Sequence, residues 1–265
     1  MTDWLDICRA AAGDVRAVLG TMPTREERSA VIGTGVGGDE TTAVDHTAET
    51  VVVERLDRSG LDFALVSEEL GHRAARDDGA VTVVLDPIDG SINAKRGIPY
   101  FSLSIAVAEG PTMADVTFGF VHDFGSGEEW TAWRGGGACL NGEPIELVVP
   151  AARIELLGLE ATKTALIAAC ATELAGVAER LRVMGSLALT MCHLAAGRVD
   201  AVATLRPARS VDIAAAQLVA RECGMTVEMV DEGSLPTAPL DLEGRSRVVA
   251  AGTPEACARV AAAIR

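Results

Sequence analysis

A short apolar run that stops at a group of carboxylates is the feature that most limits how this chain can fold. Residues 81–85 are apolar or β-branched, and residues 86–91 after them read DPIDGS. The run predicts a buried strand, and Asp, Pro and Gly directly after it predict a tight turn at its end. A plain turn is one interpretation. The other is a cation site, because Asp86 and Asp89 are two oxygen-donor side chains three residues apart.

A second acid pair, Glu68 and Glu69, ends the preceding predicted strand. If the two strands are neighbours, this pair lies beside Asp86. Taken alone, such a pair is more often a solvated surface feature. Asp45 and Asp212 each stand at the start of a helical pattern, where an aspartate is usually a cap that contributes about 1 kcal/mol. Each carboxylate therefore keeps a structural and a functional interpretation.

The apolar periodicity changes near residue 150. Before it, helical patterns at residues 4–19 and 44–56 accompany several short strands, which indicates an α+β arrangement. After it, strands and helices alternate, which indicates an α/β arrangement. We therefore predict an α/β protein with an N-terminal α+β subdomain, residues 1–150, carrying most candidate metal ligands, and a C-terminal α/β subdomain, residues 151–265, carrying Asp212 and the substrate contacts. The predicted strands are residues 63–66, 81–85, 101–108, 116–121, 129–133, 155–159, 201–205, 226–230 and 247–250, and the later helices are residues 186–196, 212–223 and 254–264.

Composition excludes some partners. With 49% hydrophobic and 23% charged residues the chain can bury a sizeable core. A net charge of -15 argues against nucleic acid or an anionic membrane surface as a partner, since both attract basic proteins. An acidic protein that binds a phosphate needs divalent cations to reverse the local charge. The six cysteines form no CxxC pair, and the first residues do not resemble a signal peptide, so we expect reduced thiols and a cytoplasmic protein.

In their order along the chain, six segments resemble the inositol monophosphatase and fructose-1,6-bisphosphatase superfamily of lithium-sensitive, magnesium-dependent phosphatases. The resemblance covers nearly the whole chain and is nearest to the archaeal-type enzymes that hydrolyse both inositol monophosphate and fructose 1,6-bisphosphate. It implies a layered α-β-α-β-α sandwich, phosphomonoesterase activity on a small phosphate ester, two or three Mg²⁺ ions in the active site, and a homodimer. The segments are GVGGDETTAVDHTAE at 35–49, SEELG at 67–71, VVLDPIDGSINAKRGIPYFSLSIAV at 83–107, GACLNGEPI at 137–145, MGSLALTMCHLAAGRVDA at 184–201 and SVDIAAAQLVARECG at 210–224.

The resemblance assigns metal ligands to particular residues. It implies that Glu68, Asp86 and the backbone carbonyl of Ile88 hold one ion, and that Asp86, Asp89 and Asp212 hold a second. Metal ions suit phosphoryl transfer because they bridge the phosphate oxygens, activate water and stabilise the leaving oxygen. No serine or cysteine nucleophile is required, and the sequence has no GxSxG motif and no P-loop motif.

Catalytic and substrate-binding roles follow from the same resemblance. Asp45 and the hydroxyl of Ser91 correspond to the pair that orients the attacking water, with Glu68 as a further catalytic residue. Ser91 stands where the family usually has threonine, so the hydroxyl is kept and a methyl is lost. The residues implied to contact the substrate beside the metal ions are Asp89, Gly90, Ser91, Gly185 and Ser186.

Two departures from the family pattern concern the substrate. Val211 and Leu205 stand where many inositol phosphatases have a tryptophan and a glutamate that receives inositol hydroxyls. Arg206 and Arg209 precede Asp212 instead. We expect at least one of them to face the end of the cleft away from the scissile phosphate, where a guanidinium suits a second anionic group. The alternative is a pair of surface arginines that bind local acids. Histidinol phosphate and adenosine 3',5'-bisphosphate remain alternative substrates.

A glycine motif offers a competing interpretation. Gly33, Gly35 and Gly38 spell GxGxxG, which is found in dinucleotide-binding proteins. Only three apolar residues precede the motif, too few for a buried strand, and Asp39 and Glu40 follow where a pyrophosphate would need a bare helix N-terminus. A dinucleotide-binding protein is therefore a distant alternative. A catalytically silent relative is a third class, and it predicts a lost ligand that this sequence does not show.

Overall fold

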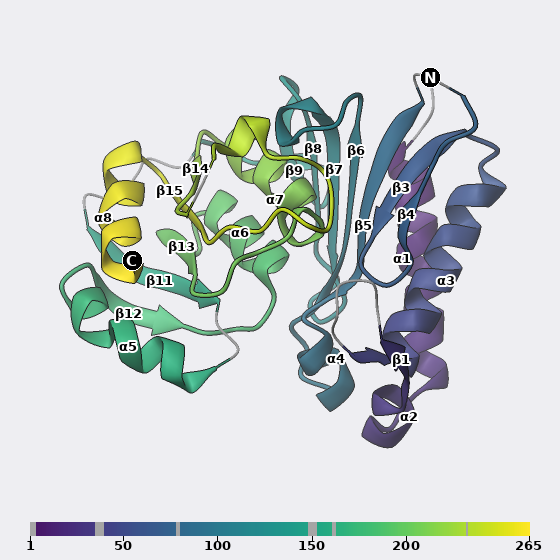
Figure 1. Ribbon diagram of the computed structural model, residues 1–265, viewed down its shortest axis with the longest axis horizontal. Coiled ribbons are helices and arrows are strands. Elements are labelled where there is room, and N and C mark those ends of the chain that lie inside the picture. Colours follow the sequence, from purple (N-terminus) through teal and green to yellow (C-terminus); the bar gives the residue numbers. More distant parts are fainter. Residues whose placement is uncertain (1–3, 35–39, 78–79, 148–152, 161–162, 232) are drawn as a thin grey trace.

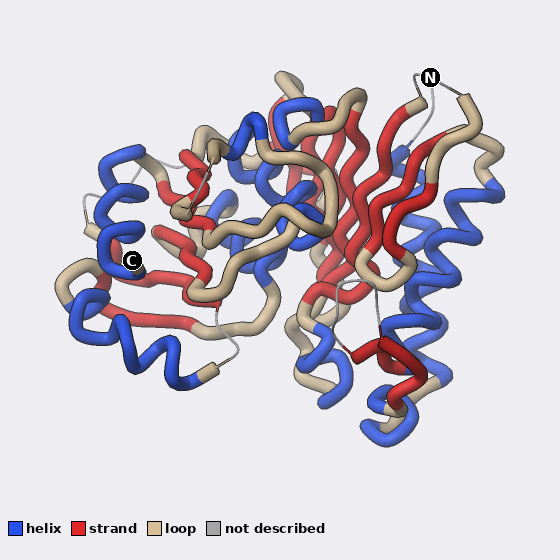
Figure 2. Tube along the Cα trace, in the orientation of Figure 1, coloured by secondary structure: helices blue, strands red, loops and turns tan. Residues whose placement is uncertain are grey.

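The computed structural model describes residues 4–34, 40–77, 80–147, 153–160, 163–231 and 233–265. Its elements stack in alternating layers of helices and sheets (Figure 1). An outer helix pair, an eight-stranded sheet, a central helix pair, a five-stranded sheet and a second outer helix pair follow one another. Figure 2 shows the same alternation by element type. The predicted α-β-α-β-α sandwich is confirmed. Within the described ranges, no helix is long and apolar enough to cross a membrane.

The large sheet has the strand order β10-β9-β8-β7-β6-β5-β3-β4. Its strands β3 (Phe63–Ser67) and β5 (Val81–Asp89) are parallel neighbours, so the acid residues after β3 lie beside the end of β5, as predicted. Its other neighbouring strands are antiparallel. The remaining strands are β4 (Gly71–Arg73), β6 (Ser102–Ala108), β7 (Val116–Asp123), β8 (Glu129–Trp133), β9 (Gly137–Leu140) and β10 (Glu143–Pro144).

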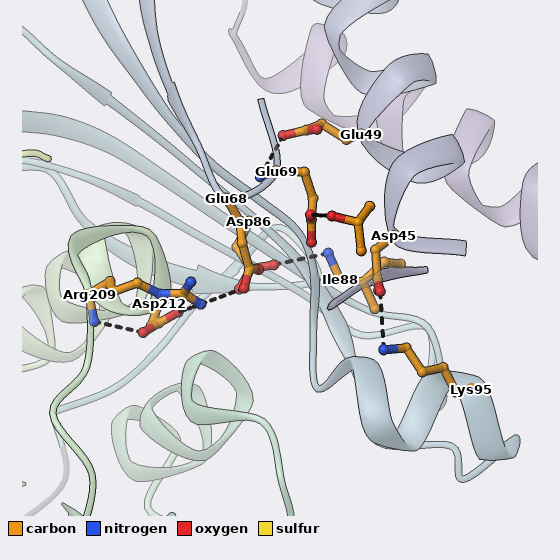
Figure 3. Close-up of polar contacts among 10 residues, drawn as sticks. Asp45, Glu49, Glu68, Glu69, Asp86, Ile88, Lys95, Arg209 and Asp212 are labelled. Carbon is orange, nitrogen blue, oxygen red and sulfur yellow. Dashed lines mark hydrogen bonds and ion pairs between the residues drawn. The ribbon is translucent and has the colours of Figure 1, made fainter. Parts of the chain in front are cut away.

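Two long helices cover the outer face of the large sheet (Figure 1). They are α1 (Trp4–Thr21) and α3 (Ala43–Arg58). Apolar residues recur along α1 at intervals of three and four, and this stripe is buried against α3 and the sheet. The start of α3 thereby brings Asp45 to the sheet edge at which β3 and β5 end (Figure 3).

The central layer consists of α6 (Leu187–Ala195) and α7 (Ser210–Glu222), which lie between the two sheets (Figure 1). Nearly all of their side chains are buried, because each helix has a sheet on both sides. Small residues permit this close packing. A Cβ atom placed on Gly119 of β7 would come within 2.8 Å of the Ala215 carbonyl oxygen of α7.

The second sheet has the order β12-β11-β13-β15-β14. Strand β11 is parallel to both of its neighbours, and β15 is antiparallel to both of its own. Helices α5 and α8 cover its outer face (Figure 1). The bounds are β11 (Ile154–Glu160), α5 (Thr164–Ala175), β12 (Ala178–Arg182), β13 (Ala201–Thr204), β14 (Thr226–Met229), β15 (Val248–Ala251) and α8 (Pro254–Ile264).

Residues 148–152, where the sequence places the subdomain boundary, lie outside the described residues. One apolar core contains Val84 of β5 together with Leu189 of α6 and Ala215 of α7, so the two halves share buried surface. The division into subdomains at residue 150 stays a prediction.

The short elements cluster at one end of the large sheet (Figure 1). Gly33 of the GxGxxG motif lies in β1, which pairs antiparallel with β2, while Gly35 and Gly38 lie outside the described residues. A dinucleotide-binding unit instead has a strand that leads into a helix and a parallel sheet, so this alternative loses its support. The short elements are α2 (Arg25–Ser29), β1 (Val31–Thr34), β2 (Glu40–Thr42) and α4 (Ser91–Arg96), and 3₁₀ turns occur at Met113–Asp115 and Leu235–Thr237.

Candidate metal centre and active site

A β-bulge directs Asp86 and Asp89 to the same face of the large sheet. Asp86 pairs with Ser104 of β6 and Asp89 pairs with Ser102, so β5 has one residue more than β6 between these pairs. Partners in a ladder share a face, and Ser102 and Ser104 are two residues apart, so both aspartates point to one side. Pro87 suits the bulge because it has no amide proton for the ladder. The order of residues in DPID thus assembles two buried carboxylates.

Burial raises the pKa of the acid groups gathered here. It is the main reason why the pKa of Asp86 lies well above its usual value, and repulsion from Glu68, Asp89 and Asp212 adds to it. Burial likewise raises the pKa of Glu68 to about 7 and that of Asp89 to about 7. Carboxylates in such surroundings are costly to keep ionised unless cations neutralise them.

Asp212 both caps helix α7 and lies beside another predicted metal ligand. Its Oδ2 accepts a hydrogen bond of 2.7 Å from the backbone N–H of Arg209, as the cap at the start of α7. Its Oδ1 lies 3.2 Å from Nη2 of Arg209, and the same nitrogen lies 2.5 Å from Oε1 of Glu68 (Figure 3). Burial lowers the pKa of Arg209, but Asp212 and Glu68 outweigh it and the pKa is raised. Arg209 therefore contacts two predicted metal ligands, as in the alternative in which these arginines bind local acids. Whether Arg206 or Arg209 faces the far end of the cleft stays a prediction.

The donor set fits divalent cations. The predicted side-chain ligands are all carboxylates, and oxygen is the donor that Mg²⁺ prefers. The positive charge of one guanidinium, that of Arg209, does not balance the negative charge of four carboxylates. The four are Glu68, Asp86, Asp89 and Asp212. Oδ1 of Asp45 is a buried oxygen with no hydrogen-bond partner in the described part of the chain, which suits a site completed by water or an ion. Among the described residues no three acid side chains converge on one point, and Nη2 of Arg209 stands between Glu68 and Asp212.

Asp45 lies at the start of α3, as predicted, and is almost fully buried. Its Oδ2 accepts a 2.5 Å hydrogen bond from the Thr42 hydroxyl. The same oxygen lies 3.2 Å from Nζ of Lys95 (Figure 3). Lys95 and Ser91 are four residues apart on α4 and so lie on one side of that helix. In the described structure α4 contacts Asp45 through Lys95, a residue to which the sequence assigned no role. The pairing of Asp45 with Ser91 stays a prediction.

Glu49 holds the turn that carries Glu68, and the sequence analysis did not identify it. Its side chain is completely buried on α3. Oε1 accepts hydrogen bonds from the Ser67 hydroxyl, from the backbone N–H of Glu69 at 3.2 Å and from that of Leu70 at 3.1 Å. The signal available in the sequence was its spacing, because Glu49 lies four residues after Asp45 and therefore on the same helix face.

Asp89 joins the two halves of the chain. Its Oδ2 accepts hydrogen bonds from the hydroxyl of Ser186 at 2.5 Å and from the backbone N–H of Ala188 at 2.8 Å, both at the start of α6. The positive end of a helix dipole favours a carboxylate there. Asn93 makes a second link, because its Nδ2 donates to the carbonyl oxygens of Tyr100 and Met184. The predicted contact residue Ser186 thus lies beside a predicted metal ligand.

Gly90 is required by its surroundings. Its φ of +93° is a conformation that favours glycine, and a Cβ atom would lie 2.9 Å from the carbonyl oxygen of Gly185. The loop that carries Gly185 therefore approaches the backbone between Asp89 and Ser91 closely. Gly90 and Gly185 meet at this point, each directly before another predicted contact residue, Ser91 and Ser186. That these four residues contact the substrate stays a prediction.

A cavity of about 190 Å³ lies next to this point. Glu160 lines it and was missed from the sequence. Its Oε1 accepts a hydrogen bond of 2.7 Å from Thr190 and its Oε2 one of 2.9 Å from the backbone N–H of Gly185, and burial raises its pKa to about 7. Leu205, by contrast, is buried in the core of the second sheet. The lining residues are Asp89, Glu160, Gly185, Leu187, Thr204, Arg206, Pro207, Ala208, Arg209, Asp212 and Arg245.

Comparison with known proteins decides the family. The sequence profile of the inositol monophosphatase family matches residues 5–265. The chain belongs to the inositol monophosphatase family. It is 34% identical over 252 residues to a fructose-1,6-bisphosphatase/inositol-1-monophosphatase of Archaeoglobus fulgidus, covering 94% of this chain and 93% of that protein. It is 32% identical over 262 residues to a protein of the same name from Methanothermobacter thermautotrophicus, covering 95% and 93%.

A solved structure supports the same family assignment. The crystal structure of an inositol monophosphatase-fructose 1,6 bisphosphatase has a TM-score of 0.86 and 28% identity to this chain, covering 99% of this chain and all of that one, 100%. Membership of the family makes this protein a metal-dependent phosphomonoesterase. The resemblance read from the six sequence segments, including its leaning toward archaeal dual-activity enzymes, is confirmed.

Proposed function

We propose that this protein is a magnesium-dependent phosphatase of small sugar or polyol phosphates, with inositol monophosphate and fructose 1,6-bisphosphate as its first candidates. The observation that carries the proposal is a group of carboxylates directly beside a cavity lined with arginines. The names of the two archaeal relatives support the substrate class. Arg206 lines the cavity with an exposed side chain, so it is a candidate for binding a second anionic group of the substrate.

In this proposal Glu68, Asp86, the carbonyl of Ile88, Asp89 and Asp212 hold two or three Mg²⁺ ions. Bound Mg²⁺ supplies a water nucleophile and stabilises the leaving oxygen. Asp45 and Ser91 orient the water, and Lys95 holds the Asp45 carboxylate in place. The backbone of Gly90 and Ser91, with Gly185 and Ser186 opposite, binds the phosphate. Glu160 accepts substrate hydroxyls in place of a carboxylate at Leu205.

Further parts of the proposal rest on the family resemblance. We expect inhibition by lithium, and inhibition by calcium, which accepts looser geometry than Mg²⁺. A homodimer is expected on the same ground. Six free thiols, five of them buried, suit a reducing compartment and support a cytoplasmic location. Histidinol phosphate and adenosine 3',5'-bisphosphate are retained as alternative substrates.

Phosphate release from a panel of these four compounds, with and without Mg²⁺, tests the proposal. We expect turnover of inositol monophosphate or fructose 1,6-bisphosphate that stops in excess chelator and returns with added Mg²⁺. Asp212→Asn serves as the inactive control, because it removes a ligand charge while its amide oxygen can still accept the N–H of Arg209. Full turnover in excess chelator would refute the metal mechanism, and preference for an alternative compound would refute the substrate class.

A further inference from the structure

Arg209 differs from the other arginines of the cavity in how deeply it is buried. Arg206 and Arg245 line the same cavity and are exposed, whereas the Arg209 side chain is only 11% exposed. Its Nη2 contacts Glu68 at 2.5 Å and Asp212 at 3.2 Å (Figure 3). Glu68 follows β3 of the large sheet and Asp212 belongs to α7 of the central layer. One guanidinium nitrogen therefore joins acid groups from two layers.

The two acids it joins are those that the family resemblance assigns to different metal ions. A carboxylate oxygen that accepts a short charge-assisted hydrogen bond has less electron density to offer a cation. A guanidinium and a divalent ion also repel each other, most strongly where water is excluded. Arg209 and the metal ions therefore compete for Glu68 and Asp212.

We propose that Arg209 is an internal competitor of the metal ions at this centre. Its guanidinium neutralises part of the carboxylate charge in the metal-free protein, and metal binding has to displace it from Glu68, from Asp212 or from both. Arg209 thereby lowers the affinity of the centre for Mg²⁺ below the value that the oxygen ligands alone would give. This inference rests on the proposed function, because it takes Glu68 and Asp212 as ligands.

The test is calorimetric titration of Mg²⁺ into metal-stripped protein, with three variants. Arg209→Met removes the guanidinium and keeps an unbranched side chain. Arg209→Lys keeps the charge and loses the planar fork. Arg206→Met is the matched control, since it removes the same charge from an exposed side chain that lines the same cavity.

We expect Arg209→Met to bind Mg²⁺ about tenfold or more tightly than the wild type, because a unit charge within about 4–6 Å shifts an ionisation equilibrium by at least that factor. Arg206→Met should change the affinity less than about threefold, since water and salt screen the charge of an exposed side chain. Arg209→Lys should lie between the wild type and Arg209→Met, because a lysine competes as a point charge only.

Two results would overturn the inference. Unchanged or weaker Mg²⁺ binding by Arg209→Met would show that Arg209 holds Glu68 and Asp212 in place and does not compete with the metal ions. Equal tightening by Arg206→Met would show that only the overall charge of the cavity matters. Thermal unfolding of the metal-free proteins checks folding, and if Arg209→Met does not fold, an affinity of Arg209→Lys no higher than that of the wild type counts against the inference. Wild-type protein that binds no Mg²⁺ would refute the proposed function itself.

Discussion

Replacing Gly90 by alanine tests how closely the two halves of the chain meet at the site. The φ of +93° at Gly90 costs an alanine about 1–2 kcal/mol. The new Cβ would also lie 2.9 Å from the carbonyl oxygen of Gly185 and 3.1 Å from that of Tyr100. These are backbone atoms and cannot turn away, and overpacking of this kind costs a further ~1–3 kcal/mol. We expect Gly90→Ala to lower the free energy of unfolding by about 2–5 kcal/mol.

Gly97 provides the matched control, because Gly90 directly precedes helix α4 and Gly97 directly follows it. Gly97 has a φ of +71°, and no atom lies within 4 Å of an added Cβ. Gly97→Ala should therefore show the conformational cost alone, about 1–2 kcal/mol. Urea unfolding followed by circular dichroism measures both variants, and phosphate release shows whether the remaining folded Gly90→Ala is impaired. Equal losses of stability in the two variants would refute the close approach of Gly185 as the cause.

Substitutions at three further residues test the site. Arg206→Ala should reduce kcat/KM for fructose 1,6-bisphosphate about tenfold and for inositol monophosphate much less, since a lost contact to a charged group costs ~1.5–3 kcal/mol; equal losses would contradict this. Glu49→Ala should raise the Mg²⁺ concentration at half-maximal activity, because three donors around the Glu68 turn lose their acceptor, while Glu49→Gln keeps an acceptor oxygen and should change it little. In the folded protein Glu160 has a pKa of about 7, above its ordinary 4.5. As the pH rises between these two values, the unfolded chain loses this proton while the folded protein keeps it, so the free energy of unfolding falls. Glu160→Gln should flatten this fall in unfolding measured from pH 4 to 8, and an unchanged pH profile would contradict it.

Strong local patterns explain most of what the sequence predicted correctly. The apolar stripe of α1 and the apolar run of β5 each match one period, so their positions could be assigned within a few residues. α5 (Thr164–Ala175) was missed because it is apolar on several sides and has no side-chain cap at Lys163. β12 (Ala178–Arg182) was missed because it is an edge strand with the polar sequence AERLR and no buried residue.

The candidate site shows a similar division. Acids that end a strand or begin a helix, such as Asp86 and Asp212, could be found from local sequence and their spacing. The contacts of Arg209, Glu49 and Glu160 could not, because each depends on a segment distant in the chain. The contact between Arg209 and Glu68 was not predicted for this reason. The three-residue distance of Arg209 from Asp212 said nothing of Glu68, which lies 141 residues away.

The tight packing of α7 between two sheets limits how enzymes of this shape can diversify. The backbone of Ala215 lies against Gly119 with no space for a side chain on that glycine, and most residues of α7 are buried. Any drift of this helix would have to move two sheets at once, so Asp212 at its first turn is fixed relative to the rest of the acid groups. We therefore expect changes in substrate preference to arise at the ends of the central helix layer, α6 and α7. The segment 205–209 leading into α7 and the loop before α6 are the regions where a directed-evolution library should be concentrated.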